Sequence, residues 1–368
     1  MGVSSLILYV WKFDGEKYQK TAIIDDATSV IWVRRFQNAG EFEIYIRATK
    51  ELFKLFTQKE LLITRHDIPE SAMIPERIEL TTDSENGNYL IISGKSAESI
   101  LGRRIVQKMA TYSGTVEVCI RYFVGICLTI PHNGSRRRIK QIEFTDLHNY
   151  PETISKQITG GNLLEAISDI CATYGYGFKL MFTGEKFIFD VYKGIDRSLH
   201  QSENKFVIFS PEFDNIGETS YIYDKSEYYN SVTIAGEGEG KDRKIYTVWN
   251  SSSIEEVSGL SLREVWVDAR NTSSNTEDEE LSNEEYEKIL RQQAKEELEQ
   301  HKVTVEFSGE ILDTGLYKFG EDYGLGDTVS IVNEFGISGT AIVTEIAEVE
   351  DEMGYKLTPT FSDWRLDQ

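Results

Sequence analysis

The chain has 368 residues, a formal net charge of −22 at pH 7, 40% hydrophobic residues and 11% aromatic residues. This apolar content excludes a disordered chain, and the length exceeds what one core supports, so we expect about two to four packed units. The excess of carboxylates makes electrostatic binding of DNA or of an anionic membrane unfavourable over most of the surface.

The first hundred residues carry short strand patterns separated by polar turns. In EFEIYIRA (41–48), the apolar Phe42, Ile44 and Ile46 alternate with polar residues, which indicates a strand with one buried face. The dipeptide Asn86–Gly87 tolerates the positive φ angles of a tight turn, and therefore predicts a hairpin there. These patterns predict a first antiparallel β-barrel or sandwich over residues 1–105.

Residues 106–200 predict an inserted α/β unit. One helix is indicated by apolar residues at helical spacing between Val116 and Val124. A second helix begins after Asn162, which can cap it, and ends at Gly175. Its apolar face comprises Leu163, Leu164, Ile167, Ile170 and Cys171. Two strands that turn at Thr183–Gly184 complete the unit.

Residues 201–250 carry strand patterns that we expect to return the chain to the barrel region. Residues 251–368 predict a second β-barrel with a helical insert at 277–302, in which Ser282 and Glu285 fit a capping box. The apolar stripe of this long amphipathic helix comprises Tyr286, Ile289, Leu290, Ala294 and Leu298. We expect either a solvated helix on the barrel surface or an oligomer contact. Four further strands follow the helix.

The segment GEGEGK (236–241) resembles part of a glycine-rich phosphate-binding loop. Such a loop needs a helix directly after its glycines, because the backbone N–H groups at the helix start bind the phosphate. Here both flanks are strands, and Glu237 and Glu239 would repel phosphate. We therefore predict an inter-strand turn or bulge, with no nucleotide.

The sequence predicts no catalytic, cofactor-binding or metal-binding residue, and hence no enzyme. Carboxylates are so abundant that no acidic pair stands out. Cys119, Cys127 and Cys171 are too few for a disulfide framework or zinc site, so we expect buried free thiols. The histidines, which we expect to be structural, are His66, His132, His148, His200 and His301. A Cys171 nucleophile with His132 or His148 as its base is disfavoured, because Cys171 lies on the apolar face of its helix.

Two further features concern location and charge. The N-terminal run SLILYVWKF lacks a basic leader, so it indicates a strand rather than a signal peptide, and no apolar run approaches the ~18 residues of a membrane span. The segment SRRRIK (135–140) is the one strong basic cluster. It is either a turn that pairs with acidic neighbours or a contact for an acidic partner protein, and it is weak evidence for nucleic acid.

The order of these elements resembles the hub proteins of bacteriophage tail baseplates. The segments that carry the resemblance are YLIISGKSAESILGRRIV (89–106), the GEGEG region and YGLGD (323–327), which places Gly326–Asp327 between strands. The resemblance implies two tail-tube-like β-barrels with inserted domains. It also implies that three copies close into a ring that adapts a six-fold tail tube to a three-fold spike or tip.

The resemblance further implies the partners and location. These are the tail tube or distal tail protein, the spike or tip protein and other baseplate subunits, in a tail baseplate or tail-like bacteriocin assembled in the bacterial cytoplasm. DNA would pass the lumen without specific binding. Because the chain stops at Gln368, we expect any lytic activity to belong to another subunit. The alternatives are a tail-associated peptidoglycan hydrolase and a carbohydrate-binding protein for host attachment, which would expose clustered aromatic residues.

Overall fold

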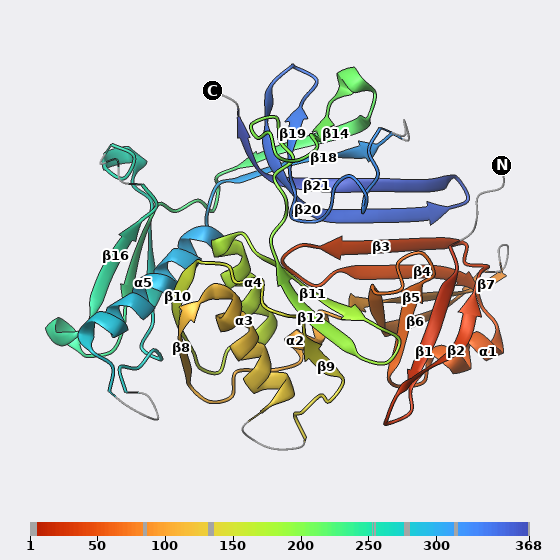
Figure 1. Cartoon of the computed structure of the whole chain (residues 1–368), viewed down its shortest axis with the longest axis horizontal. Helices are drawn as coiled ribbons and strands as arrows, with labels where there is room; N and C mark the ends of the chain where they lie inside the picture. The colour runs from red at the N-terminus through yellow and green to blue at the C-terminus, as the bar shows by residue number, and fades with distance from the viewer. Residues whose placement is uncertain are drawn as a thin grey trace.

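A computed structural model of the chain describes residues 6–83, 87–131, 136–251, 253, 255–275, 280–312 and 316–366. Strands dominate, and four sheets and five α-helices build the described ranges (Figure 1). The expected class, mainly β with an α+β insert, is confirmed. Within these ranges, no helix combines the length and apolar character needed to cross a bilayer.

The first curved sheet follows the order β3-β4-β7-β6-β5-β1-β2 and encloses a core that includes Trp32, Phe42 and Ile44. Its strands are β1 (Leu8–Phe13), β2 (Tyr18–Ile24), β3 (Ser29–Arg35), β4 (Glu41–Arg47), β5 (Leu61–Arg65), β6 (Ala72–Asp83) and β7 (Gly87–Ser96). The predicted β6–β7 hairpin is confirmed through the pair Asp83–Gly87, while Asn86 lies outside the described residues.

One helix in this part was not expected from the sequence. Helix α1 (Lys50–Phe56) begins after Thr49, whose hydroxyl accepts a hydrogen bond from the Leu52 N–H at 3.1 Å. Phe56 is buried in the core of the first sheet. The cap and the apolar spacing of Leu52 and Phe56 were a readable signal, but the helix is short and lies in a run of strand patterns.

The second curved sheet pairs with the first through β3 and β20, so that both belong to one continuous 13-stranded sheet. Its strands are β13 (Ile208–Phe209), β14 (Ile216–Asp224), β18 (Thr304–Ile311), β19 (Thr328–Val332), β20 (Ser338–Asp351) and β21 (Gly354–Leu366). A 3₁₀ turn, η2 (Pro211–Phe213), joins β13 to β14. The core of this sheet includes Phe209, Phe307 and Phe361.

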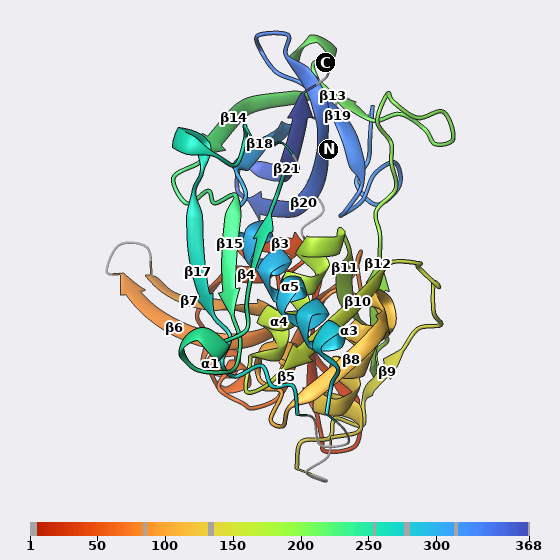
Figure 2. The ribbon, with the colours of Figure 1, turned by 90° about the vertical axis from the view of Figure 1, so that its left-hand side faces the viewer.

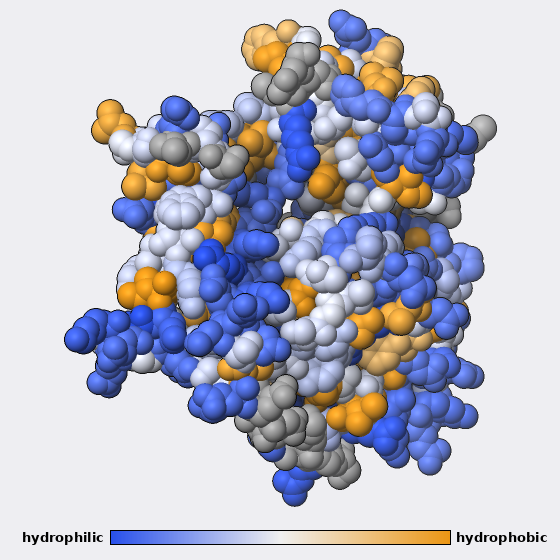
Figure 3. All heavy atoms as spheres, turned by 60° about the vertical axis from the view of Figure 1, so that its left-hand side comes forward, coloured by the Kyte–Doolittle hydropathy of each residue, from blue (hydrophilic) through white to orange (hydrophobic). Residues whose placement is uncertain are grey.

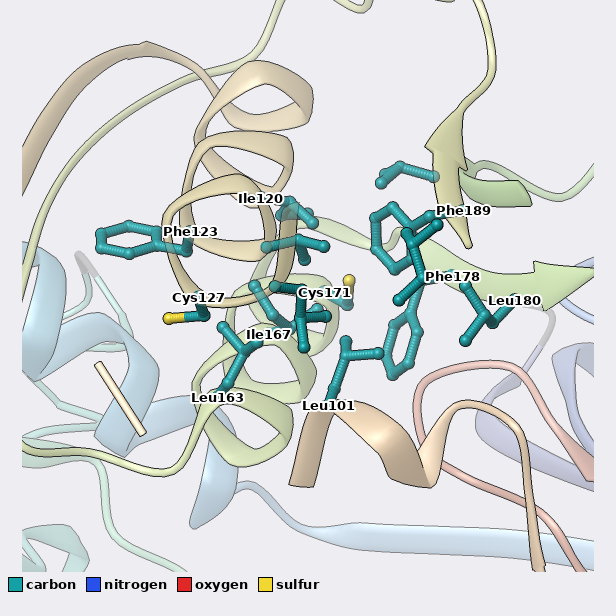
Figure 4. Close-up of a cluster of buried hydrophobic side chains, with 14 of the residues drawn as sticks. Leu101, Ile120, Phe123, Cys127, Leu163, Ile167, Cys171, Phe178, Leu180 and Phe189 are labelled. Carbon is teal, nitrogen blue, oxygen red and sulfur yellow. The ribbon is translucent and has the colours of Figure 1, made fainter. Parts of the chain in front are cut away.

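The α/β insert lies between the two sheets in sequence and packs against β5 and β6 of the first sheet. Its elements are α2 (Ser99–Gly102), β8 (Ala110–Thr115), α3 (Val116–Val124), the π-helical η1 (Gly125–Thr129), β9 (Ile142–Phe144), β10 (Thr153–Ile158), α4 (Leu163–Tyr174), β11 (Gly177–Phe182) and β12 (Phe187–Tyr192). The Asn162 side chain accepts a hydrogen bond from the Leu164 N–H at 2.9 Å, and Gly175 ends α4 with a φ of 68°, as predicted. Figure 4 shows Ile120 of α3, Cys171 of α4 and Phe178 of β11 in one core.

A small sheet and the longest helix form the remaining part. Strands β16 (Ile245–Trp249), β15 (Ser231–Ala235) and β17 (Glu264–Asp268) pair in this order, with two 3₁₀ turns, η3 (Gly240–Asp242) and η4 (Gly259–Ser261), in their connections. Helix α5 (Asn283–Gln300) covers one face, where Tyr286 and Leu290 pack on Val232 and Ile234. The predicted capping box of Ser282 and Glu285 is present.

The small sheet and α5 correct two expectations, the first in part. Within 201–250, β13 and β14 do join the large sheet, whereas in the described residues the strands at 231–249 pair with each other and with β17. Helix α5 is not a solvated surface helix, since its polar Gln292 and Glu296 are buried and face the α/β insert. The apolar stripe correctly predicted one buried face of α5. The second buried face carries polar residues, and a polar helix face is normally taken to be exposed to solvent.

Candidate functional site

The cysteines and histidines form no reactive pair in the described residues. Cys119, Cys127 and Cys171 are buried and free, as predicted, and burial raises the pKa of each thiol. His148 Nε2 lies 3.0 Å from Asp190 Oδ1, whose pKa is lowered by hydrogen bonds from Thr145 and His148 against the opposing effect of burial. His132 lies outside the described residues. Among the described residues, no group of three or more His, Cys, Asp or Glu is placed to hold a metal ion.

The other histidines have structural surroundings. His66 Nδ1 lies 2.7 Å from the Tyr9 hydroxyl. His301 follows α5 directly, and its Nδ1 lies 3.1 Å from the carbonyl oxygen of Glu227. His200 is exposed on the connection between β12 and β13. His66 thus contacts a tyrosine hydroxyl, and His301 contacts a backbone carbonyl oxygen.

The GEGEGK segment connects β15 to β16, as the sequence predicted. Gly238 has a φ of 98°, and Arg243 closes the turn by donating to the carbonyl oxygens of Gly236 (3.0 Å) and Ala235 (2.9 Å). The Tyr286 hydroxyl of α5 accepts a hydrogen bond from the Glu237 N–H at 2.9 Å. A Cβ on Gly236 would lie 2.4 Å from this hydroxyl, so the glycine provides the space in which α5 docks.

A candidate surface for contacts between chains is a run of eight neighbouring strands in the order β14-β18-β21-β20-β3-β4-β7-β6. In Figure 2 they follow one another from β14 near the top to the β6–β7 hairpin at the lower left. Every neighbouring pair is antiparallel. The run therefore crosses from the second curved sheet into the first without a break.

The face of this run opposite the two cores carries many charged residues, which lie beside apolar ones such as Ile31 and Ile91. On β4, Glu41, Glu43 and Arg47 are exposed and alternate with the core residues. Ion pairs neutralise several of its cations: Arg35 with Glu41 (2.8 Å) and Glu345 (2.5 Å), Arg77 with Glu79 (2.5 Å), and Lys356 with Glu310 (2.9 Å). Such a face stays hydrated and presents few unpaired cations to an anionic polymer.

Both ends of the run leave backbone groups without a strand partner in the described residues. Among the described strands, β14 pairs with β18 alone, and its Tyr221, Ile222 and Tyr223 are about half exposed. Strand β6 pairs with β5 only at Ala72 and Met73, so its remaining length has β7 on one side alone. Soluble proteins rarely leave long apolar edge strands open, because such edges pair with other chains.

The YGLGD motif fixes the junction between the second sheet and the α/β insert. Asp327 Oδ1 accepts from the Ile195 N–H (2.7 Å), and Oδ2 accepts from Arg197 (2.7 Å) and from the Gly324 N–H (2.9 Å). Gly326, with a φ of 88°, lies against the Phe36 ring of the first sheet. No local pattern in the sequence distinguishes Phe36, since a buried aromatic residue after a strand is common.

Comparison with known proteins identifies the family and the fold. Residues 7–362 match the family described as Siphovirus ReqiPepy6 Gp37-like protein. The chain is similar to the tail protein from Neisseria meningitidis MC58, at 15% identity and a TM-score of 0.60, with 98% of this chain and 97% of that chain covered. No curated protein sequence matches it.

Two further solved structures share the arrangement. The 43 kDa tail protein of prophage MuSo2 from Shewanella oneidensis has 11% identity and a TM-score of 0.57, with 96% of this chain and 98% of that chain covered. The prophage tail protein gp18 from Listeria monocytogenes EGD-e has 15% identity and a TM-score of 0.50, with 98% and 94% covered. The family match spans nearly the whole sequence, so this chain belongs to the Siphovirus ReqiPepy6 Gp37-like protein family and has the fold of phage tail proteins.

Proposed function

We propose that this chain is the structural hub of a phage or phage-like tail baseplate, and that three copies form a ring between the tail tube and the spike or tip. The observation that carries the proposal is the eight-stranded run with an open edge at each end. The number of three copies follows the resemblance to tail hub proteins. The role is mechanical and needs no catalytic residue.

Strand direction supports closure of the ring. The run is antiparallel throughout and has an even number of strands, so β14 and β6 point in opposite directions. Rotation about an axis parallel to the strands would bring β14 of one copy beside β6 of the next, in the same antiparallel sense as every other pair. Head-to-tail contacts of this kind close into rings when the rotation fits.

The charged residues on the face opposite the two cores fit the lumen of such a ring. Its ion-paired cations and its exposed Glu41 and Glu43 would let DNA pass without specific binding. The tail tube or distal tail protein would stack on one end of the ring and the spike or tip protein on the other, with other baseplate subunits around it. We place the protein in the virion tail or in a tail-like particle, assembled in the bacterial cytoplasm.

Light scattering on the purified chain tests the ring. We expect the mass of three chains, or a single chain that becomes three when the spike protein is added. Ile222→Lys on β14 and Leu80→Lys on β6 should each leave single chains, because both side chains are exposed and a lysine on an edge strand blocks pairing. Ile23→Lys on the edge strand β2 is the matched control and should still assemble.

Two results would contradict the proposal. A stable dimer would exclude the three-copy ring, and three-chain assembly by both edge variants would exclude the edges as its contacts. Lysis of cell-wall substrate by the isolated chain in zymography would favour a peptidoglycan hydrolase instead.

One observation favours a second candidate, carbohydrate binding. Trp249 and Trp266 are exposed on the face of the small sheet opposite α5, with Thr233 and Thr247 between them. Hydrophobic residues on this side of the molecule otherwise form small, separate patches (Figure 3). Indole rings stack on the apolar faces of sugars, so host cell-wall polysaccharide should quench tryptophan fluorescence, and Trp266→Ala should remove the effect. An unchanged spectrum would exclude this candidate.

A further inference from the structure

A cationic surface lies at one end of the α/β insert of this acidic chain. Residues 99–142 contain eight Lys and Arg residues and a single carboxylate, Glu117, whereas the whole chain has a net charge of −22. Glu117 is buried and paired with Arg121 at 2.9 Å. The other cations of the segment therefore lack a carboxylate within their own stretch of sequence.

The fold brings two distant parts of this segment together. Arg137 Nη2 donates to the Ile105 carbonyl oxygen (2.6 Å), and Arg137 Nη1 donates to Gln107 Oε1 (2.9 Å). Burial, and after it the nearby charges of Arg137 and Arg103, lower the pKa of Arg104. We call the resulting surface the cationic patch, and it comprises Arg103, Arg104, Arg136, Arg137, Arg138 and Lys140.

The cationic patch is poorly neutralised within the chain. In the part of the chain that the structure describes, Glu76 is the one carboxylate within ion-pair distance of these six side chains, at 2.9 Å from Arg103. Arg136, Arg138 and Lys140 are exposed. The first alternative left by the sequence, that SRRRIK (135–140) is a turn paired with acidic neighbours, is not supported in the described residues, because Arg103 lies outside that segment.

Apolar side chains lie among these charges. Ile105, whose carbonyl oxygen binds Arg137, has 49% of its surface exposed, and Ile130 at the end of η1 has 78% exposed. The Ile139 N–H donates to the Leu128 carbonyl oxygen (2.7 Å), which holds residues 136–140 against the end of η1 at the lower edge of the molecule in Figure 1. The surface thus offers positive charge and apolar contact together.

We propose that the cationic patch binds an acidic segment of a partner protein that also carries apolar side chains. Charge complementarity favours an acidic partner, since within the described residues Glu76 is the one carboxylate that pairs with any of these six cations. The two exposed isoleucines favour polypeptide over nucleic acid, because a phosphate backbone offers them no apolar surface. The negative charge of the rest of the chain also repels DNA.

A pair of peptides tests the proposal on the intact chain. One is a short peptide of alternating Glu and Leu, and the other alternates Glu and Ser. We expect the Glu–Leu peptide to bind more tightly, with an affinity that falls as salt is raised. The triple variant Arg136→Glu, Arg138→Glu and Lys140→Glu should lower the affinity for both peptides by about tenfold or more. Three charges are reversed together because each exposed charge contributes only a small amount to binding. Thermal unfolding of the variant checks that it folds.

Two further variants separate the effect of net charge from the contributions of the cationic patch and of its exposed isoleucines. The control is the triple variant Lys50→Glu, Lys54→Glu and Lys59→Glu, which makes the same change in net charge at exposed lysines around α1 and should leave binding unchanged. The double variant Ile105→Ser with Ile130→Ser should lower the affinity for the Glu–Leu peptide and leave the affinity for the Glu–Ser peptide unchanged.

Three outcomes would overturn the proposal. An equal loss of peptide binding in both charge-reversed triple variants would show that binding depends on the net charge of the chain rather than on the cationic patch. A single-stranded oligonucleotide that binds more tightly than either peptide at the same salt would identify a nucleic-acid surface. Self-association of the wild-type chain that the patch triple abolishes, without peptide binding, would identify a contact between copies.

Discussion

Phe36 is the residue at which three parts of the chain meet. It is buried, its N–H donates to the Thr344 carbonyl oxygen of β20 (2.9 Å), and its ring centroid lies 5.4 Å from that of Tyr192 in the insert. A Cβ on Gly177 would lie 2.1 Å from its ring, and one on Gly326 would lie 2.3 Å from it. The two glycines therefore allow the insert and the second sheet to close around one aromatic ring.

Replacing Gly177 tests this contact. Gly177→Ala should destabilise the protein by about 1–3 kcal/mol, because the added methyl group overpacks the junction against Phe36 and its backbone. Urea unfolding measures the difference. Gly125→Ala is the control, since a Cβ there would lie 3.9 Å from the Thr129 hydroxyl oxygen and the residue is helical. Equal losses in both variants would contradict the close packing at Phe36.

The surroundings of Glu152 lead us to expect that the free energy of unfolding depends on pH. The hydrogen bond from Lys193, followed by that from the Tyr176 hydroxyl (2.6 Å), lowers the pKa of Glu152 from 4.5 to about 2. A carboxyl group whose pKa is lower in the folded state stabilises that state above the unfolded pKa and loses this contribution as pH falls toward the folded pKa. The contribution of Glu152 should therefore be complete above about pH 5 and decline between about pH 4.5 and 2.

The variant Glu152→Gln measures this contribution. Because the side chain is about one third exposed, we expect a loss of only about 1 kcal/mol at neutral pH. The difference from wild type in urea unfolding should shrink as the pH is lowered from 6 to 3. Glu185→Gln, in the exposed turn between β11 and β12, should show no such trend. A difference for Glu152→Gln that grows in acid would contradict the sign.

At the scale of elements, α5 joins two parts of the chain by different chemistry on its two faces. Its apolar face packs on the small sheet. Its other face carries Glu296, in a buried ion pair with Lys156 of β10, and Gln292, whose Oε1 accepts a hydrogen bond from the Tyr174 hydroxyl at 2.7 Å. The helix is thus the structural link between the small sheet and the α/β insert.

The buried pair can be tested by removing one partner or both. Lys156→Met alone should cost about 3–5 kcal/mol, because it leaves the Glu296 carboxylate buried without its partner. The double variant Lys156→Met with Glu296→Leu should recover most of that loss, since no unpaired charge remains. Chemical denaturation of the two single variants and the double variant gives the coupling. Additive losses would show that the pair does not act as a unit.

Local patterns predicted most elements but not all their surroundings. The alternation around Phe42 and the cap at Asn162 predicted a strand and a helix that the structure contains. The apolar stripe on α5 predicted the helix face that packs on the small sheet. The burial of Glu296 could not be predicted, because its partner Lys156 lies 140 residues away in the sequence. A polar residue becomes internal only when a distant partner compensates its desolvation.

At the scale of the whole molecule, the two curved sheets share one ladder of hydrogen bonds. The β3–β20 pairing runs from Val30 and Glu350 to Arg35 and Glu345. In the continuous sheet, the two cores lie on either side of this pairing. Unfolding of one core should therefore expose an edge of the other, and the two should unfold together.

A proline in the shared ladder tests this coupling. Ala347→Pro, at a position that pairs with Val33 of β3 and Thr358 of β21, should lower the melting temperature and split the calorimetric transition into two. Thr247→Pro, in an edge strand of the small sheet, should preserve the coupling of the two large sheets. A single transition in the Ala347→Pro variant would show that the β3–β20 pairing is not what couples them.

The sequence by itself determined the β-rich class, the buried face of most strands, the ends of α4 and α5, and the strand that follows GEGEGK. These properties follow from short-range periodicity and from capping residues, which act within a few positions. The tertiary structure alone decided that β3 pairs with β20, that β14 and most of β6 lack a second strand partner among the described residues, and that Arg137 lies beside Ile105. A strand pattern specifies which face is buried but not which strand lies alongside, because the backbone groups that pair are the same in every residue.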